Sequence, residues 1–364
     1  MLGFIDNSSL LIIVIIFIAA GAVTWIAGIT LAKATDTLDT RLHIGDAMGG
    51  LVLLGITGSL PEIAVEWSAA VNHHIPVIIG NLIGGLSIQT LVIVIFDLAM
   101  KGKRPLSYHA GSKMLLFETL FAMVITALAL VGLFIPAGEA VFQINPMSIA
   151  IVVAWIVGLF LINKARTNKS FNETADDKEK RFGRRHHERR SVENHAFFKN
   201  KSTLHVIVIF LIASIATLIS GVLLEETGTK IADTLNIGSG LFAATAIALV
   251  TSLPEISTGL ESIFIGDNHL AIADIMGGNA VMLVIFLMAD IVAGQPVLSY
   301  DLGLPMLTSL HTDVLLTVLS IAMMGIYAIA FIRPPQYRIL HMGWDSIWQI
   351  IVYIAGMMGF NMIK

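Results

Sequence analysis

The sequence predicts an all-α, polytopic membrane protein with about ten transmembrane helices in two inverted five-helix repeats. Three observations indicate this fold class: long apolar runs, a one-sided distribution of Lys and Arg, and an internal repeat. Hydrophobic residues make up 56% of the chain and charged residues 13%, about half the charged fraction of a typical soluble domain. We therefore expect a protein of the lipid bilayer, with no nucleic-acid partner. The chain has no cysteine, which excludes disulfides and thiolate metal sites.

Apolar runs separated by polar breaks define the predicted spans. The run Leu10–Leu31 contains no charged residue and is long enough to cross a hydrocarbon layer of about 30 Å, since a helix rises about 1.5 Å per residue. The ten predicted spans are residues 10–32, 45–71, 74–98, 112–135, 147–163, 203–224, 238–265, 269–293, 310–332 and 345–362.

The positions of Lys and Arg predict the orientation. With ten spans, both termini and the even-to-odd loops share one side, and of 22 Lys and Arg residues only Lys230 and Lys364 lie there. Cytoplasmic loops are enriched in Lys and Arg, so we expect both termini outside. We expect the inner (plasma) membrane of a bacterium or archaeon.

One long hydrophilic segment divides the chain into three parts. We expect transmembrane halves at residues 1–163 and 203–364, joined by a cytoplasmic loop at 164–202 that mixes basic and acidic residues. The favoured interpretation of this loop is a solvated linker, and the alternative is a regulatory or anionic-lipid-binding segment.

The internal repeat aligns Gly45–Asp97 with Gly238–Asp290 at an offset of 193 residues and without a gap. Its core is the run SLPEI, at residues 59–63 and again at 252–256. Each half holds five spans, an odd number, so the second copy enters the membrane from the opposite face. Inverted repeats of this kind place the substrate site near the middle of the bilayer, where the two copies meet.

The repeated motif places a carboxylate well inside an apolar span. Glu62 and Glu255 each follow a proline, and an ionised side chain at that depth costs roughly 2.5–3.5 kcal/mol unless it has a partner. Pro61 and Pro254 lack an N–H group, so each frees a carbonyl oxygen in the preceding turn. Carboxylate, carbonyl and serine oxygens suit hard cations such as Ca²⁺ or Na⁺.

Sequence spacing predicts that four polar side chains meet at one depth. Glu62 and Asn81 are 19 residues apart, and so are Glu255 and Asp274, with a polar turn between the members of each pair. A helical hairpin returns the chain to the same depth after that distance. Two symmetric carboxylates without a nearby basic residue repel each other, so a cation or a proton must neutralise them.

Several polar residues near the motif have less decisive patterns. Glu66 lies one turn beyond Glu62 and could flank an access path, although its repeat counterpart is Gly259. Asp97 is expected to pair at the membrane interface with the lysines that follow it. His74, like the other histidines at hairpin tips, is expected to be solvated.

These motifs resemble the calcium/cation antiporter superfamily, and within it the sodium/calcium exchanger-like branch. The α-repeat of that family reads roughly G-T-S-L-P-E and then G-x-x-x-G-S-N, over about 45–98 and 238–293 here. The matching residues are 251–255 (TSLPE) and 59–62 (SLPE) for the first motif, and Gly80, Asn81, Gly84, Asp274, Gly277 and Asn279 for the second.

The resemblance implies a secondary active antiporter, not an enzyme, that exchanges Ca²⁺ for Na⁺ or H⁺ by alternating access. It implies no cofactor beyond the transported cations. Glu62 and Glu255 would be the central cation-binding carboxylates, with Asn81 and Asp274 completing the layer. The flanking ligands would be Ser59, Ser252, Thr251 and the backbone near Gly58.

Departures from the family pattern remove side-chain oxygens. Gly58 stands where the family has Thr, and Gly85, Gly278 and Leu86 also replace residues with side-chain oxygens. We therefore keep proton coupling, or a different cation, as an alternative to sodium coupling. A cation channel is the alternative from another class. The sequence contains no HExxH, GxSG or cysteine that would favour an intramembrane enzyme, and it does not predict the oligomeric state.

Overall fold

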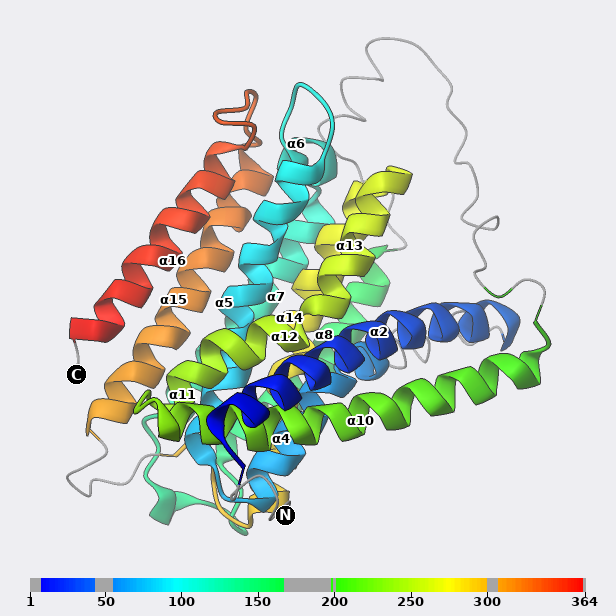
Figure 1. The fold of residues 1–364 in the computed structure, drawn as a ribbon. Coiled ribbons are helices and arrows are strands. Elements are labelled where there is room, and N and C mark those ends of the chain that lie inside the picture. Colours follow the sequence, from blue (N-terminus) through cyan, green and yellow to red (C-terminus); the bar gives the residue numbers. More distant parts are fainter. Residues whose placement is uncertain (1–7, 43–54, 167–197, 199–200, 300–306, 363–364) are drawn as a thin grey trace, which may run out of the picture.

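The computed structural model describes residues 8–42, 55–166, 198, 201–299 and 307–362, and this part of the chain is almost entirely helical (Figure 1). In chain order the elements are α2 (Leu10–Leu42), α4 (Leu60–Val71), α5 (Ile75–Ala99), α6 (Leu106–Ala110), α7 (Lys113–Gly132), the 3₁₀ turn η2 (Ala137–Glu139), α8 (Pro146–Arg166), α10 (Thr203–Thr234), α11 (Ser239–Phe242), the π-helical turn η4 (Ala243–Ile247), α12 (Ala248–Thr251), α13 (Leu253–Ile265), α14 (Asn268–Ala293), α15 (Leu307–Ile332) and α16 (Trp344–Met362). Within the described ranges, β structure is limited to two isolated bridges.

The helices confirm the predicted fold class. Seven single helices among the described residues are long and apolar enough to cross a membrane, and α11–α13 form an eighth, bent span. The second predicted span is represented by a helical turn at 55–58 and by α4, because residues 45–54 lie outside the described part. The tenth predicted span corresponds to α16, which packs beside α15.

The two repeats run in opposite directions. In Figure 1, α4 leads toward the lower end of the helix bundle and α13 leads toward the upper end. The connections after α5, α13 and α15 lie at the upper end, whereas the turn between α4 and α5 lies at the lower end. This alternation is the inverted arrangement that an odd number of spans per half predicts.

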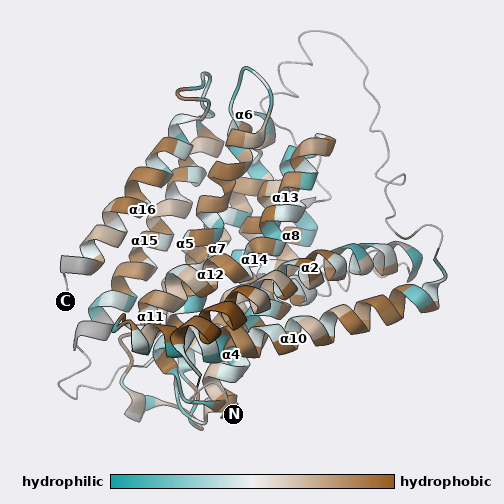
Figure 2. Cartoon of the chain, viewed as in Figure 1, coloured by the Kyte–Doolittle hydropathy of each residue, from teal (hydrophilic) through white to brown (hydrophobic). Residues whose placement is uncertain are grey.

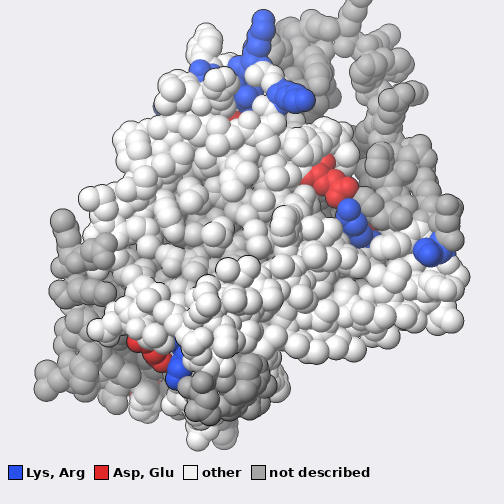
Figure 3. All heavy atoms as spheres, in the orientation of Figure 1, with Lys and Arg blue, Asp and Glu red and all other residues white. Residues whose placement is uncertain are grey.

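The surface pattern fits a lipid environment. Figure 2 shows hydrophobic residues along the outer helices α2, α10 and α16, and hydrophilic residues mainly at the connections. On the face drawn in Figure 3, charged side chains lie at the upper and lower ends and in a small group toward the right side, and a broad uncharged region lies between them. Exposed apolar side chains on the outer helices include Ile18 of α2 and Ile212 of α10, as expected for surfaces that contact lipid chains.

Two helices extend about ten residues beyond their predicted ends. The first and sixth spans were expected to end at residues 32 and 224, but α2 continues to Leu42 and α10 to Thr234. The charged residues at those points find partners instead of ending the helix. Lys33 forms an ion pair with Glu261 at 3.3 Å, and Glu225 is buried against α4. α2 and α10 also pack against each other.

Small residues let the backbones of the two repeats come into contact. A Cβ atom added to Gly80 of α5 would lie 2.1 Å from the carbonyl oxygen of Gly240, and one added to Gly84 would lie 2.3 Å from the Cβ of Ala244. Both distances are far below van der Waals contact, so α5 can lie against α11 and η4 only with glycine at these two positions.

Asp97 holds together two connections at the upper end of the molecule. It accepts hydrogen bonds from the backbone N–H of Leu106 at 2.8 Å, from that of Gly343 at 2.8 Å and from the Ser346 hydroxyl at 2.9 Å. Arg338 contacts the same carboxylate at 3.4 Å. The expected pairing of Asp97 with the lysines that follow it was wrong. Its cationic partner is Arg338, which lies 241 residues further along the chain.

Asp290 plays the equivalent part in the second repeat. Its side chain accepts hydrogen bonds from the backbone N–H groups of Val297 at 2.7 Å and Asn145 at 3.0 Å. Each aspartate therefore joins the connection that follows its own helix to the start of a helix from the other half of the bundle. Alignment of the repeats predicted that Asp97 and Asp290 are equivalent. In the structure both accept hydrogen bonds from the backbone of two connections.

His74 was expected to be solvated, but its side chain is bound to α10. Its Nδ1 lies 2.6 Å from Oε1 of the fully buried Glu225. The Ser68 hydroxyl and the Asn72 amide donate to the other oxygen, at 2.6 and 3.2 Å. This polar cluster fastens the turn between α4 and α5 to the sixth span.

We expect Asp97→Ala to lower the thermal unfolding temperature of the detergent-solubilised protein strongly. The change leaves Arg338 and two backbone N–H groups without their acceptor, and breaking a buried pair of this kind costs about 3–5 kcal/mol. Thermal unfolding followed by size-exclusion fluorescence measures the effect. Glu139→Ala, at an exposed acid in η2, is the matched control and should leave the unfolding temperature unchanged. Equal stability of the two variants would contradict the role of Asp97.

We expect the contact between His74 and Glu225 to make stability depend on pH. The hydrogen bond to Glu225 raises the pKa of His74 above its ordinary value of 6.5, with smaller contributions from Glu226 and Asp233, while partial burial opposes the shift. A raised pKa contributes stability that is complete below pH 6.5 and is lost as pH rises through the raised value.

The unfolding temperature of the wild type should therefore fall relative to that of His74→Gln as pH is raised from about 6 to 9. The neighbouring exposed His73 adopts a positive φ of 56°, which asparagine tolerates, so His73→Asn is the matched control and should follow the wild type. Parallel curves for the wild type and His74→Gln would refute the ion pair.

Candidate cation-binding site

The site is built around two breaks in helices, one in each repeat. Before Pro61 the helix turns at Ser59, with φ −88° and ψ 13°, and before Pro254 it turns at Ser252, with φ −81° and ψ −1°. Both serines occupy the sparsely populated region between helix and strand that is common in active sites. In the second repeat the axis bends by 44° at this point. The predicted interruption of both spans is confirmed.

Each break brings opposite helix ends together. Pro61 and Pro254 offer no N–H group to the carbonyls of the preceding turn, and each following helix begins with a carboxylate in its first turn, Glu62 in α4 and Glu255 in α13. The ends of broken helices that expose carbonyls are typical cation-coordinating elements in transporters. The π-helical turn η4, of a kind often found at functional sites, precedes the second break by one turn.

Glu62 and Glu255 approach each other in the interior of the bundle. Glu62 is completely buried, Glu255 is half-buried, and the two carboxylates interact electrostatically. Among the described residues, neither oxygen of Glu62 has a hydrogen-bond partner, nor has Oε2 of Glu255. The other charged group that acts on Glu255 is Asp274, which is also acidic. Three acids from two repeats therefore share one region without a positive charge among these interactions.

Asn81 contacts α4 through Glu66, one turn beyond Glu62, the residue with which the spacing predicted it to share one depth. The Asn81 amide donates from Nδ2 to Oε1 of Glu66 at 2.8 Å, and both residues are completely buried. Glu66 also interacts electrostatically with Glu62. Glu66 is therefore buried one turn from Glu62 in this conformation, and its role beside an access path stays a prediction.

Asp274 occupies the more open side of the site. It interacts with Glu255, and Thr258 of α13 lies beside its carboxylate. Asp274 is exposed, whereas its repeat counterpart Asn81 is completely buried.

The expected flanking residues lie around the two breaks. Thr251 is buried beside the Glu62 carboxylate, and its hydroxyl donates to the carbonyl of Ala248 at 3.2 Å. The Ser252 hydroxyl donates to the same carbonyl at 2.7 Å, so both hydroxyl oxygens keep lone pairs. Ser59 is buried. Gly58 contributes only backbone, and no atom lies within 4 Å of a Cβ placed there.

Charged side chains alone do not form a metal cage in this structure. No group of three or more His, Cys, Asp or Glu side chains within the described ranges is arranged to hold a metal ion. A cation at this position therefore needs the neutral oxygens of the broken helices as well as the carboxylates. Ca²⁺ and Na⁺ accept such mixed sets of carboxylate, carbonyl and hydroxyl ligands. The role of the predicted residues as ligands stays a prediction.

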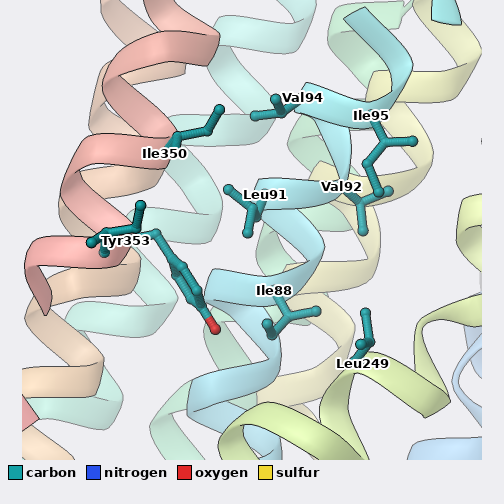
Figure 4. A pocket seen from close by; sticks show the side chains of 9 residues that line it. Ile88, Leu91, Val92, Val94, Ile95, Leu249, Ile350 and Tyr353 are labelled. Atoms are coloured by element: carbon teal, nitrogen blue, oxygen red, sulfur yellow. The ribbon is translucent and has the colours of Figure 1, made fainter. Parts of the chain in front are cut away.

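An apolar groove lies apart from this site. It has a volume of about 320 Å³ and lies between α5, α12 and α16 (Figure 4). Its lining is apolar except for Tyr353, and it contains no carboxylate. A groove of this composition on the side of a membrane protein offers nothing to bind an inorganic cation.

Sequence reasoning singled out the buried acid Glu66 but missed a second one, Glu225, to which the structure connects it. Glu66 interacts electrostatically with Glu225, which in turn is held by the cluster around His74. A signal for Glu66 was available, since it stands one helical turn from Glu62 and faces the same way. Glu225 gave no local signal, because its partners lie more than 150 residues away in the sequence.

Comparisons with known proteins agree with this architecture. The Escherichia coli inner membrane protein YrbG is 25% identical to this chain over 258 residues, which cover 71% of this chain and 72% of that protein. The structure resembles the H⁺/Ca²⁺ exchanger CAX with a TM-score of 0.57 and 13% identity, covering 96% of this chain and 89% of the other.

It also resembles the sodium–calcium exchanger NCX_Mj with a TM-score of 0.54 and 16% identity, covering 96% of this chain and 99% of the other. At such low identity these two likenesses show a shared fold. Residues 11–163 and 205–360, most of the chain, match the family described as sodium/calcium exchanger protein. The chain therefore belongs to the sodium/calcium exchanger family of membrane transporters.

Proposed function

We propose that this protein is a secondary active antiporter that exchanges Ca²⁺ for Na⁺ or H⁺ by alternating access. The observation that carries this proposal is the meeting of Glu62 and Glu255 at two oppositely directed helix breaks. Their carboxylates repel each other, and the other charged groups shown to act on them, Asp274 and Glu66, are also acids. A mobile cation supplies the missing positive charge.

Charge neutralisation also gives a reason for obligatory exchange. A divalent cation neutralises the Glu62 and Glu255 pair, and two monovalent ions or protons do the same. Occupancy by one excludes the other. An empty site leaves unneutralised carboxylates in a low-dielectric interior, which disfavours the conformational step that would carry it across the membrane empty.

This chain lacks several side-chain oxygens of the family pattern, and their absence favours protons as the counter-ion. Gly85 and Leu86 lie buried in α5 where the family pattern has side-chain oxygens, and Gly58 leaves its position without a hydroxyl. Na⁺ needs a complete shell of oxygens, whereas a proton needs only the carboxylate itself. Sodium remains the second candidate, supported by the family to which the chain belongs.

The distribution of Lys and Arg supports an orientation with both termini outside and the 164–202 loop in the cytoplasm. Lys101, Lys103 and Arg104 belong to the connection at the upper end of Figure 1, and Arg333 and Arg338 to the neighbouring one. On this basis residues 1–163 and 203–364 are the two transmembrane halves. The inner or plasma membrane of a bacterium or archaeon is the proposed location, as for YrbG.

We expect Glu62→Gln and Glu255→Gln each to reduce Ca²⁺ uptake into proteoliposomes to the level of empty vesicles. Either change removes half of the charge that binds the divalent ion and leaves the side-chain volume unchanged. Thermal stability should be kept or increased, because a buried carboxylate has been neutralised. Glu139→Gln, at an exposed acid, is the control. Normal uptake by the Glu62→Gln/Glu255→Gln variant would remove these residues from the mechanism.

The same assay separates exchange from conduction. Antiport predicts uptake that saturates with Ca²⁺ concentration and accelerates when the counter-ion is loaded on the opposite side. A channel would show neither dependence at moderate concentrations.

We expect Gly58→Thr to increase competition by Na⁺. Position 58 aligns with Thr251 in the other repeat, and the open space around Gly58 admits a threonine side chain. The variant should need a several-fold lower Na⁺ concentration to displace Ca²⁺ in isothermal titration, because it regains one oxygen ligand. Gly138→Thr, at another open glycine far from the site, is the matched control. Strong competition by Na⁺ in the wild type, unchanged by Gly58→Thr, would contradict proton coupling.

A further inference from the structure

The apolar groove between α5, α12 and α16 is open to the surroundings of the protein (Figure 4). Three of the residues that line it, Ile95, Leu249 and Ile354, keep between 41% and 52% of their surface exposed. The groove lies among the membrane-spanning helices, so the medium that meets these side chains is hydrocarbon rather than water.

The groove follows one half of the bilayer. At one end is Leu249, three residues before the helix break at Ser252, and inverted repeats hold such breaks near the middle of the membrane. At the other end is Ile95, one turn before α5 ends. From Ile88 to Ile95 the helix rises about 10 Å, which is within the roughly 15 Å of hydrocarbon in one leaflet.

Exposed positive charge stands where the groove reaches the membrane surface. α5 ends at Ala99, and the connection that follows carries Lys101 and Lys103, both of which are exposed. The connections 100–105 and 333–343, which lead out of α5 and into α16, contain five Lys and Arg residues and neither Asp nor Glu. Figure 3 shows Lys and Arg side chains at this upper end of the molecule.

Arg338 binds these two connections to each other above the groove. Its guanidinium donates to the carbonyl oxygens of Met100 at 2.9 Å and Arg104 at 3.1 Å. The chain that enters α16 is therefore joined to the chain that leaves α5, and the basic connections lie at the shared upper end of the two groove walls.

The combination of an apolar groove and a basic end matches one class of ligand. An anionic phospholipid carries an acyl chain that fits an apolar groove in the hydrocarbon layer and a phosphate that attracts lysine at the surface. Basic pockets between transmembrane helices bind anionic head groups in this way, and each Lys near the surface strengthens the attraction about fivefold. A zwitterionic lipid offers the same chains without the net negative charge.

We propose that the groove between α5, α12 and α16, together with Lys101 and Lys103, binds one anionic phospholipid of the adjoining leaflet. One acyl chain occupies the groove, and the phosphate lies against the two lysines. In the proposed orientation this is the cytoplasmic leaflet. The inference does not depend on which ions are exchanged. Because α12 leads directly into the break at Ser252, the bound lipid supports the segment that precedes the candidate cation site.

Native mass spectrometry of the purified, delipidated full-length protein tests the proposal. The probes are phosphatidylglycerol and phosphatidylcholine with the same acyl chains. The wild type should bind its first phosphatidylglycerol at a concentration roughly tenfold lower than its first phosphatidylcholine, because two lysines act on the anionic head group. Lys101→Gln/Lys103→Gln should remove this preference and leave phosphatidylcholine binding unchanged.

Lys113→Gln/Lys201→Gln is the matched control for charge. Both lysines are exposed and lie outside the groove walls, so this variant loses the same charge and should keep the wild-type preference.

Leu91→Trp tests the groove itself. The larger ring takes up the space of the acyl chain and should weaken phosphatidylglycerol binding several-fold although both lysines are kept. Ile18→Trp, on the lipid-exposed face of α2, is the control for added bulk. Thermal unfolding shows whether each variant is folded. If Leu91→Trp does not fold, Ile354→Trp at the exposed rim of the groove takes its place.

Three results would overturn the inference. The first is equal binding of the two lipids by the wild type. The second is an equal loss of preference in both double lysine variants, which would assign the attraction to the charge of the whole face. The third is wild-type binding of phosphatidylglycerol by a folded variant with tryptophan in the groove, which would show that no acyl chain enters it.

Discussion

Repulsion between two buried carboxylates is the constraint on which the rest of this structure depends. Glu62 and Glu255 are brought together by α4 and α13, which approach the middle of the bundle from opposite ends. Folding alone gives no reason to place like charges in a low-dielectric region. If the proposed function holds, the broken helices and the inverted repeat bring these carboxylates together where a transported cation would neutralise them.

The scaffold around this site repeats its solutions in both halves. Asp97 and Asp290 each end a long central helix and collect hydrogen bonds from two connections, one of them from the other half. Asp97 and Asp290 thus connect helices at the ends of the bundle, away from Glu62 and Glu255. The outer helices α2 and α10 pack together and contact α13 and α4 respectively. Fixed helix ends and interrupted helices in the middle would suit the proposed alternating access, because the site could open to either side while the fold is kept.

The parts of the structure that sequence could predict are those governed by local or repeated patterns. Apolar length identified the spans, and the SLPEI repeat identified both the inverted topology and the helix breaks at Ser59 and Ser252. Pairings across long sequence separations could not be predicted. Glu225 with His74, and Arg338 with Asp97, join residues 151 and 241 positions apart. The same limitation explains why α2 and α10 extend beyond their predicted ends. A span predicted from hydropathy ends at a charged residue, whether or not that residue has a partner in the folded protein.

The contact of Gly80 and Gly84 with the other repeat constrains how the two copies can diverge. At these positions the first copy touches backbone of the second, and no side chain fits. The aligned positions in the second copy are Ala273 and Gly277, and a Cβ at Gly277 would meet no atom within 4 Å. At these two aligned positions the copies of a duplicated ancestor therefore inherit unequal freedom: the first copy has to keep glycine, and the second can carry a larger side chain.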